Sequence, residues 1–241
     1  MPRKILVFVA LAIALSALFV RLGFWQLARL SERRALNAQT LAQFQHAAVP
    51  FDATMQDSMQ EYRKVIVHGI PDWTNEIVLA GRSRNGSPGV HILTPVRLAT
   101  DTSTIIMVNR GWVYAPDAKT VDLARWREDR STFSGYTRFI GMQRQTDAPR
   151  AEERVIRTLS GRGVSQLLSH AVAVNYVVDQ DSIAIADSTP ARLPPPALNE
   201  GPHMNYTIQW FAFAAIGLVG ALIVTRKARA ESRVTSHESR Q

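Results

Sequence analysis

The sequence predicts an α+β fold in which a β-rich, mostly antiparallel domain lies between two transmembrane helices. Apolar segments of membrane length occur at residues 5–27 and 206–225. The stretch between them is polar enough for water, has a single-domain length, and contains short apolar runs of strand length. It shows no alternation of strands with helices, which a doubly wound sheet would need.

We therefore expect four parts along the chain. An N-terminal transmembrane helix takes residues 1–28, and an extracytoplasmic domain with its linker takes residues 29–202. A C-terminal transmembrane helix follows at residues 203–226, and a polar, disordered cytoplasmic tail at residues 227–241.

The first apolar segment admits two interpretations. Arg21 follows an uncharged run at residues 5–20, and a short basic leader before such a run is also typical of a signal peptide. The small residues at 14–17 offer a cleavage site for that alternative. However, apolar character resumes after Arg21 and adds Phe24 and Trp25, aromatic residues that suit the interface of an anchor. We predict an uncleaved helix.

Basic residues set the expected orientation in the membrane. They flank the outer ends of both segments, at Arg3, Lys4, Arg226, Lys227 and Arg229. By the positive-inside rule both termini are expected in the cytoplasm. The protein is then expected in the cell inner (plasma) membrane, with its central domain in the periplasm. Arginines also follow the first segment on its far side, but long domains translocate largely regardless of charge.

Composition narrows the function further. The formal net charge of +8 comes from dispersed basic residues, which favours attraction to lipid headgroups and no nucleic-acid partner. The absence of cysteine excludes a disulfide framework, a thiol redox pair, covalent c-type haem and thiolate metal sites. No hydrolase, metalloprotease or phosphate-loop motif is present, so we do not expect an enzyme.

The central domain is expected to begin with a polar helical continuation at residues 29–46. Strands are predicted at residues 62–68, 76–80, 91–98, 103–109, 133–142 and 171–178, a turn rich in Gly and Asn at 81–89, and a short helix at 164–170. The segment VNRGWV at 108–113 is interpreted as a turn with a core aromatic at a strand end. The segment GVHILTP at 89–95 is also interpreted as structural, with His91 as a metal ligand the lesser alternative.

Two glycines in these segments carry an expectation of their own. Because Gly89 and Gly111 each lie where a turn would join a strand, we expect neither to tolerate a side chain.

The strongest candidate site lies at the N-terminal end of the second helix, which we call its mouth. His203, Tyr206 and Trp210 follow three- and four-residue spacing, which puts them along one helix face. A neutral imidazole there suits an axial ligand of haem iron, and the aromatic rings suit a porphyrin. The alternative is an ordinary interfacial aromatic belt with His203 as a polar cap.

The outer end of the first helix reaches the same interface if the two helices cross the membrane in opposite directions. It contributes Trp25, Gln26 and Arg29, which then lie at the same interface as Gln209 and Trp210. The Arg29 guanidinium suits a haem propionate, or a lipid phosphate as the alternative.

These segments together resemble a known family. LGFWQLAR at 22–29, GR at 81–82, GVHILTP at 89–95, VNRGWV at 108–113, and HMNY with QWF at 203–211 occur in the order seen in the Surfeit locus protein 1 family of cytochrome c oxidase assembly factors. The resemblance implies a two-helix membrane protein that binds haem a and presents it to oxidase subunit I, with haem a synthase as a further partner. The family's histidine falls on His203.

One alternative and one departure accompany the resemblance. The alternative is a scaffold that stabilises oxidase assembly intermediates without touching haem. In the family an Asn usually lies closer to the histidine, whereas here Glu-Gly-Pro separates Asn199 from His203. Because Pro202 disfavours helical geometry in the residue before it, we expect His203 in the first helical turn or just before it.

Overall fold

A computed structural model of the chain describes residues 2–52, 54, 59–141, 154–168, 172–181 and 189–238. Its contacts divide the chain into two units, residues 1–39 with 198–241, and residues 40–197. The first unit is a pair of helices, and the second is a β domain.

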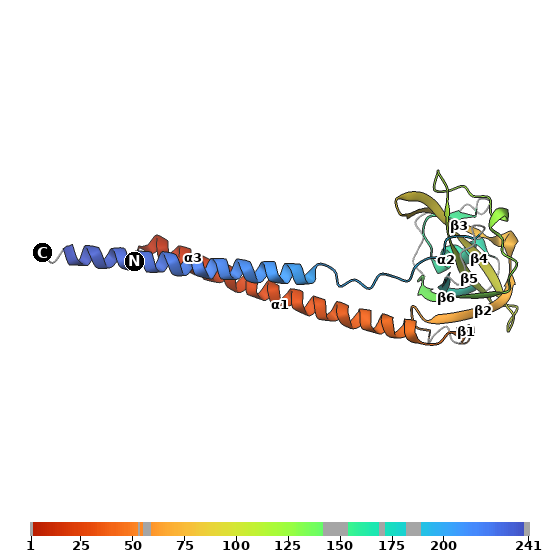
Figure 1. The fold of residues 1–241 in the computed structure, drawn as a ribbon, viewed down its shortest axis with the longest axis horizontal. Helices are drawn as coiled ribbons and strands as arrows, with labels where there is room; N and C mark the ends of the chain where they lie inside the picture. Colours follow the sequence, from red (N-terminus) through yellow and green to blue (C-terminus); the bar gives the residue numbers. More distant parts are fainter. Residues whose placement is uncertain are drawn as a thin grey trace. The chain divides into compact units, whose positions relative to one another are not determined.

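The helix pair consists of α1 (Arg3–Gln45) and α3 (His203–Glu238), which run antiparallel so that both termini lie at the same end (Figure 1). Each is long and apolar enough to cross a membrane. Only 6% of the most apolar stretch of α1 and 17% of that of α3 are buried. Neither helix is therefore the covered core helix of a soluble domain. α1 also continues through the polar stretch that the sequence predicted to be helical.

The tail departs from expectation. α3 continues past Arg226 to Glu238, so the predicted disorder is wrong over this stretch. The sequence there contains neither Gly nor Pro and is rich in Ala, Arg and Glu, residues with high helix propensity.

Small residues bring the two helices together. On α3 the buried positions recur every seven residues, at Thr207, Ala214, Ala221 and Ala228. On α1 they are Ser16, Gly23, Gln26 and Leu30. A Cβ on Gly23 would lie 2.6 Å from the Phe211 ring, and one on Gly217 would lie 2.4 Å from Ser16 Oγ. This seven-residue seam of small side chains permits close backbone approach, as in coiled coils and membrane helix pairs.

The β domain is built on a mixed sheet of eight strands within the described residues. They are β1 (Val49–Pro50), β2 (Lys64–Pro71), β3 (Ile77–Arg84), β4 (Ser87–Leu98), β5 (Ile105–Tyr114), β6 (Thr132–Phe139), β7 (Val155–Ile156) and β8 (Val172–Gln180), in the order β1-β2-β6-β8-β5-β4-β3-β7. Most pairs are antiparallel, as predicted; β1–β2, β3–β7 and β5–β8 are parallel.

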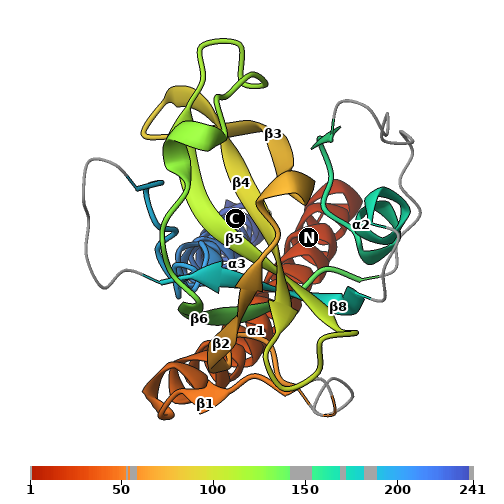
Figure 2. The same cartoon turned by 90° about the vertical axis from the view of Figure 1, so that its right-hand side faces the viewer.

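The sheet also closes on itself, which the sequence did not predict. The last residues of β2 pair with the end of β4, Gly69 opposite Leu98, so that β2, β6, β8, β5 and β4 form a ring (Figure 2). Closure removes free edges from these strands.

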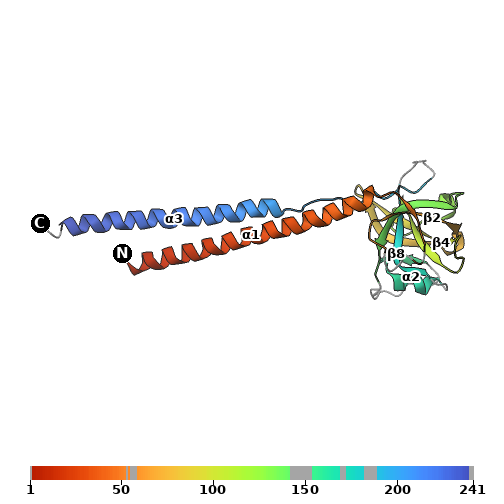
Figure 3. The same cartoon turned by 90° about the horizontal axis from the view of Figure 1, so that it is seen from below.

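Two hydrophobic clusters occupy the two sides of the ring. One draws side chains from every ring strand and therefore fills the interior, for example Val67, Val108 and Val178. The other takes Met107 and Val177, which point the opposite way, and packs them under β3, β7 and α2 (Gly161–Leu167). Figure 3 shows α2 beside β8. Burial on both faces explains why β5 begins with an uninterrupted apolar run rather than an alternating one.

Several predicted boundaries were wrong because two strands pass through glycines. β3 does not end at Ala80 but continues to Arg84, and the turn is only Asn85–Gly86, with φ of +51° and +80°. These values suit a two-residue hairpin turn of the primed type. Gly81, with φ +71°, lies at a bulge that lets β3 continue.

The VNRGWV segment is likewise not a turn, because β5 runs through it to Tyr114. Gly89 and Gly111 therefore lie inside strands, and the predicted reason for their constraint was wrong. A Cβ on Gly89 would lie 2.4 Å from Trp112 Nε1, and one on Gly111 would lie 2.4 Å from the carbonyl oxygen of Ala191. The expected lack of room for a side chain is borne out by these distances.

The predicted helix at 164–170 forms three residues earlier, as α2. Ser160 caps it by accepting a hydrogen bond from Gly163 N at 3.1 Å. The last two predicted residues lie outside the described part of the chain.

Candidate functional site

His203 is the first residue of α3. Gly201 has φ +69°, which turns the chain, and the carbonyl of Pro202 accepts a hydrogen bond from Tyr206 N at 3.1 Å. The Gly-Pro pair thus starts the helix directly at the histidine, within the range that the sequence allowed.

The residues before the helix are tied to α1. Arg34 binds the Glu200 carboxylate through two nitrogens at 2.8 and 2.9 Å. Arg33 Nε and Asn37 Nδ2 both donate to the carbonyl oxygen of Asn199, at 3.3 and 3.1 Å. The hydrogen bond from Arg34 lowers the pKa of Glu200 below its usual value. These bonds fix the level at which α3 begins against α1.

At that level His203 meets Gln26. The distance from His203 Nδ1 to Gln26 Oε1 is 2.8 Å. An amide oxygen only accepts hydrogen bonds, so Nδ1 carries the proton. In the neutral imidazole the lone pair is then on Nε2.

Gly201 lies beside this lone pair. A Cβ at Gly201 would stand 3.5 Å from His203 Nε2 and 3.4 Å from Cδ2. The missing side chain leaves Nε2 open. A histidine whose other ring nitrogen donates to an oxygen is the usual arrangement of a metal-bound imidazole, so the residues present fit an axial ligand of haem iron.

The other predicted residues of α3 have different surroundings. Tyr206 is 45% exposed, one turn from His203. Trp210 stacks on Phe19 of α1, with ring centroids 5.6 Å apart and an interplanar angle of 25°. One face of its indole is therefore already covered by the helix pair. Its Nε1 is buried without a hydrogen-bond partner in the described structure.

Trp25 and Arg29 form a pair on α1. The Arg29 guanidinium lies 5.7 Å from the Trp25 ring centroid and also binds Glu32 at 2.8 Å. The five predicted residues thus fall into two groups, one on each helix, and the side chain of α1 that contacts His203 is Gln26. Sequence reasoning placed Gln26 at this interface but gave it no role; a polar side chain within an apolar helix was the signal.

The β domain holds a buried ion cluster that sequence reasoning missed. The Arg110 side chain is 0% exposed and binds Glu76 Oε1 at 3.2 Å and Glu128 Oε1 at 2.9 Å. Its guanidinium also lies 5.0 Å from the Trp73 ring centroid. Arg192 closes the cluster, donating to Glu128 Oε2 at 2.8 Å.

A bulge produces this cluster. Ile92 pairs with Gly111 and Leu93 with Asn109, so Arg110 is the extra residue of β5 and turns inward. Burial raises the pKa of Glu128, but hydrogen bonds from Arg192 and Arg110 outweigh it and leave that pKa below its usual value. Arg130 Nε also lies 3.2 Å from Glu128 Oε2, so three guanidinium groups surround the two carboxylates, and the cluster ties separate segments of the β domain together.

A metal role for His91 gains no support, because the described residues contain no group of three His, Cys, Asp or Glu side chains that could hold an ion.

Comparison with known proteins agrees with the motif order. The model of the SURF1 family matches residues 13–215. A SURF1-like protein of Rickettsia felis is 26% identical over 221 residues, covering 87% of this chain and 92% of the relative. One of Monosiga brevicollis is 28% identical over 229 residues, covering 86% and 83%. The cytochrome oxidase assembly protein SHY1 of Saccharomyces cerevisiae is 30% identical over 107 residues, covering 42% and 27%. Since the family match spans most of the chain, from within the first apolar helix into the second, the protein belongs to the SURF1 family.

Proposed function

We propose that this chain is a membrane-bound assembly factor for cytochrome c oxidase, which binds haem a where the start of α3 meets α1 at His203 and Gln26, and assists its insertion into subunit I. Family membership and the assembly role named for the yeast relative support the oxidase as the target. The observation that carries the haem assignment is the Nδ1–Oε1 contact between His203 and Gln26, which leaves Nε2 free.

The residues have separate tasks in this proposal. His203 Nε2 ligates the iron, and Gln26 holds the imidazole in its tautomer and orientation. Tyr206 and Trp25 present exposed rings to the porphyrin. Arg29 gives up its ion pair with Glu32 and binds a haem propionate instead. The haem passes from haem a synthase to this site and then to subunit I.

The location follows from the same arrangement. Both termini lie at one end of the helix pair and carry basic residues, and by the positive-inside rule this supports cytoplasmic termini and a periplasmic β domain. The haem site then lies at the outer surface of the cell inner membrane.

The test is the absorption spectrum of the full chain, purified in detergent from cells that co-express the haem a biosynthetic enzymes. The wild type is expected to carry haem a. His203→Ala should lose it while protein abundance and membrane insertion stay near normal, since a residue at the mouth contributes little to core packing. Gln26→Leu should weaken haem binding by about 10–100-fold, the usual effect of removing the partner of a ligating histidine.

Gln209→Leu is the matched control, because Gln209 is an exposed amide on the same helix near the mouth and should leave the spectrum unchanged. Unchanged haem content in His203→Ala would sink the ligand assignment. A colourless wild type would favour the scaffold, which stabilises oxidase intermediates without haem. If His203→Ala loses haem but the oxidase assembles at the normal rate, the proposal that this chain delivers haem a to subunit I is overturned.

A further inference from the structure

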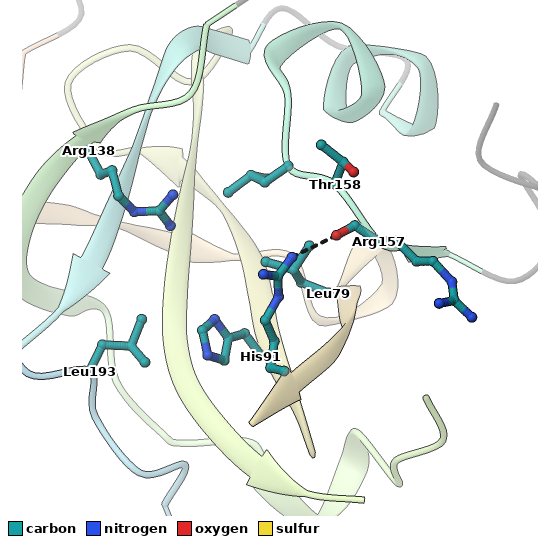
Figure 4. Close-up of a pocket in the computed structure, with 8 residues that line it drawn as sticks. Leu79, His91, Arg138, Arg157, Thr158 and Leu193 are labelled. Carbon is teal, nitrogen blue, oxygen red and sulfur yellow. Dashed lines mark hydrogen bonds between the residues drawn. The ribbon is translucent and has the colours of Figure 1, made fainter. Parts of the chain in front are cut away.

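A cavity of about 540 Å³ lies in the β domain, between β3, β4 and β6 and the segment that joins β7 to α2 (Figure 4). Its polar lining includes Arg82, His91 and Arg138, and its apolar lining is Leu79, Leu159 and Leu193. The volume lies within the range of small-molecule sites. Nothing in the haem assignment uses this cavity.

Within the described part of the chain, the cavity carries one positive charge that no carboxylate compensates. Arg138 is neutralised by Asp179, whose two oxygens it binds at 2.5 and 2.9 Å. Arg82 donates to the carbonyl oxygen of Arg157 at 2.6 Å and pairs with no carboxylate among the described residues. The Arg157 side chain itself points away from the cavity (Figure 4).

Arg82 is also short of acceptors. Its Nε is buried and has no hydrogen-bond partner in the described structure. Burial lowers the pKa of Arg82, and repulsion from Arg138 adds to this, yet a guanidinium remains protonated. A buried donor on an unpaired cation costs free energy that a bound anion would recover.

His91 adds a neutral donor. The Asn109 amide donates to Asp179 at 2.8 Å and accepts from Gly111 N at 3.2 Å, which fixes its orientation. Its Nδ2 then donates to His91 Nδ1 at 3.4 Å, so the histidine proton is on Nε2. Burial, followed by the charge of Arg82, lowers the pKa of His91 to about 4, and the ring is neutral at pH 7.

We propose that this cavity binds a small organic monocarboxylate with an apolar body. The carboxylate pairs with Arg82, with Arg138 and His91 Nε2 as flanking donors, and the apolar body contacts the three leucines. A single net charge matches a monocarboxylate better than a phosphate dianion, and the leucines require a ligand with carbon surface.

Benzoate is a suitable probe, and calorimetric titration of the full chain in detergent is the measurement. The wild type is expected to bind one benzoate, and benzamide, its uncharged isostere, should not bind. Arg82→Gln should weaken benzoate binding by about 10–100-fold, the loss expected for a charge-assisted hydrogen bond. Arg84→Gln removes the same charge from the same strand outside the cavity and should bind benzoate as the wild type does.

Arg82→Lys keeps the charge but loses the fork of donors, and gives an intermediate affinity; it also serves if Arg82→Gln does not fold. The proposal is overturned if benzoate does not saturate the wild type, if Arg82→Gln binds it unchanged, or if benzamide binds equally well. Inorganic phosphate binding as tightly as benzoate would overturn the monocarboxylate assignment.

Discussion

Arg110 is a fully buried cation at the centre of the ion cluster in the β domain. Replacing it with Leu leaves Glu76 buried without its ion-pair partner and removes one of the cations that bind Glu128, which is far more costly than losing an exposed ion pair. We expect Arg110→Leu to lower the free energy of unfolding by about 3–5 kcal/mol, measured by chemical denaturation of the full chain in detergent. Arg125→Leu is the control, an exposed arginine over the Trp126 ring, with an effect within about 1 kcal/mol. Equal losses in the two variants would contradict the structural role of the cluster.

His91 makes stability depend on pH in a defined window. Its pKa falls from 6.5 to about 4 on folding, so between these values the unfolded chain binds a proton that the folded chain does not. The contribution of His91 to stability is therefore complete above pH 6.5 and decreases as the pH falls toward 4, by up to about 3 kcal/mol. We expect His91→Gln to flatten the pH dependence of the unfolding midpoint in this window; an unchanged slope would show that the ring titrates normally.

At the scale of the elements, the helix pair makes a matched test possible. A Cβ on Gly217 would strike Ser16 Oγ, whereas one on Gly220 would meet nothing within 4 Å. Gly217→Leu should therefore push α3 away from α1, and Gly220→Leu should not. Because the chain has no cysteine, oxidative cross-linking of Gln26→Cys with His203→Cys can report the contact. Cross-linking should be fast with Gly220→Leu and strongly slowed with Gly217→Leu; similar rates would mean that the small-residue seam is not needed.

The sequence predicts helices and strands better than it predicts bulges, strand ends and long-range strand pairing. Hydropathy located both helices, and strand-length apolar runs located the ring strands, because these signals repeat along the chain. The bulges at Gly81 and Arg110 were missed, since a single residue with unusual backbone geometry leaves no periodic signal. Ring closure was missed because the β2–β4 pairing joins residues far apart in sequence.

The candidate site shows the same limit. The antiparallel course of the helices predicted that residues 25–29 lie beside the start of α3, but which side chain of α1 faces His203 depends on helix rotation and level. Those are set by the Arg34–Glu200 pair and by Gly23, so Gln26 could not be singled out in advance. The partners of Arg110 come from three separate segments, and no spacing connects them.

For the whole molecule, the testable property is its orientation in the membrane. The basic flanks of both helices predict that a reporter fused after Arg229 is active in the cytoplasm and one inserted at the exposed Asn85–Gly86 turn is active in the periplasm. Enzyme reporters that work in only one compartment make the measurement. The opposite pattern would contradict the proposed location. If both fusions are active in the cytoplasm, the β domain stays on the cytoplasmic side of the membrane.

The position of β8 in the ring governs when the β domain can fold. β8 is the last strand of the sheet in chain order, yet it lies between β5 and β6. The ring therefore cannot close until residue 180 has emerged on the side where the domain folds, and such distant pairing is slow. In that interval the apolar start of β5 has an unpaired edge, which attracts other chains. We expect this interval, rather than the finished fold, to be the period in which the newly made protein is most exposed to aggregation and to proteases.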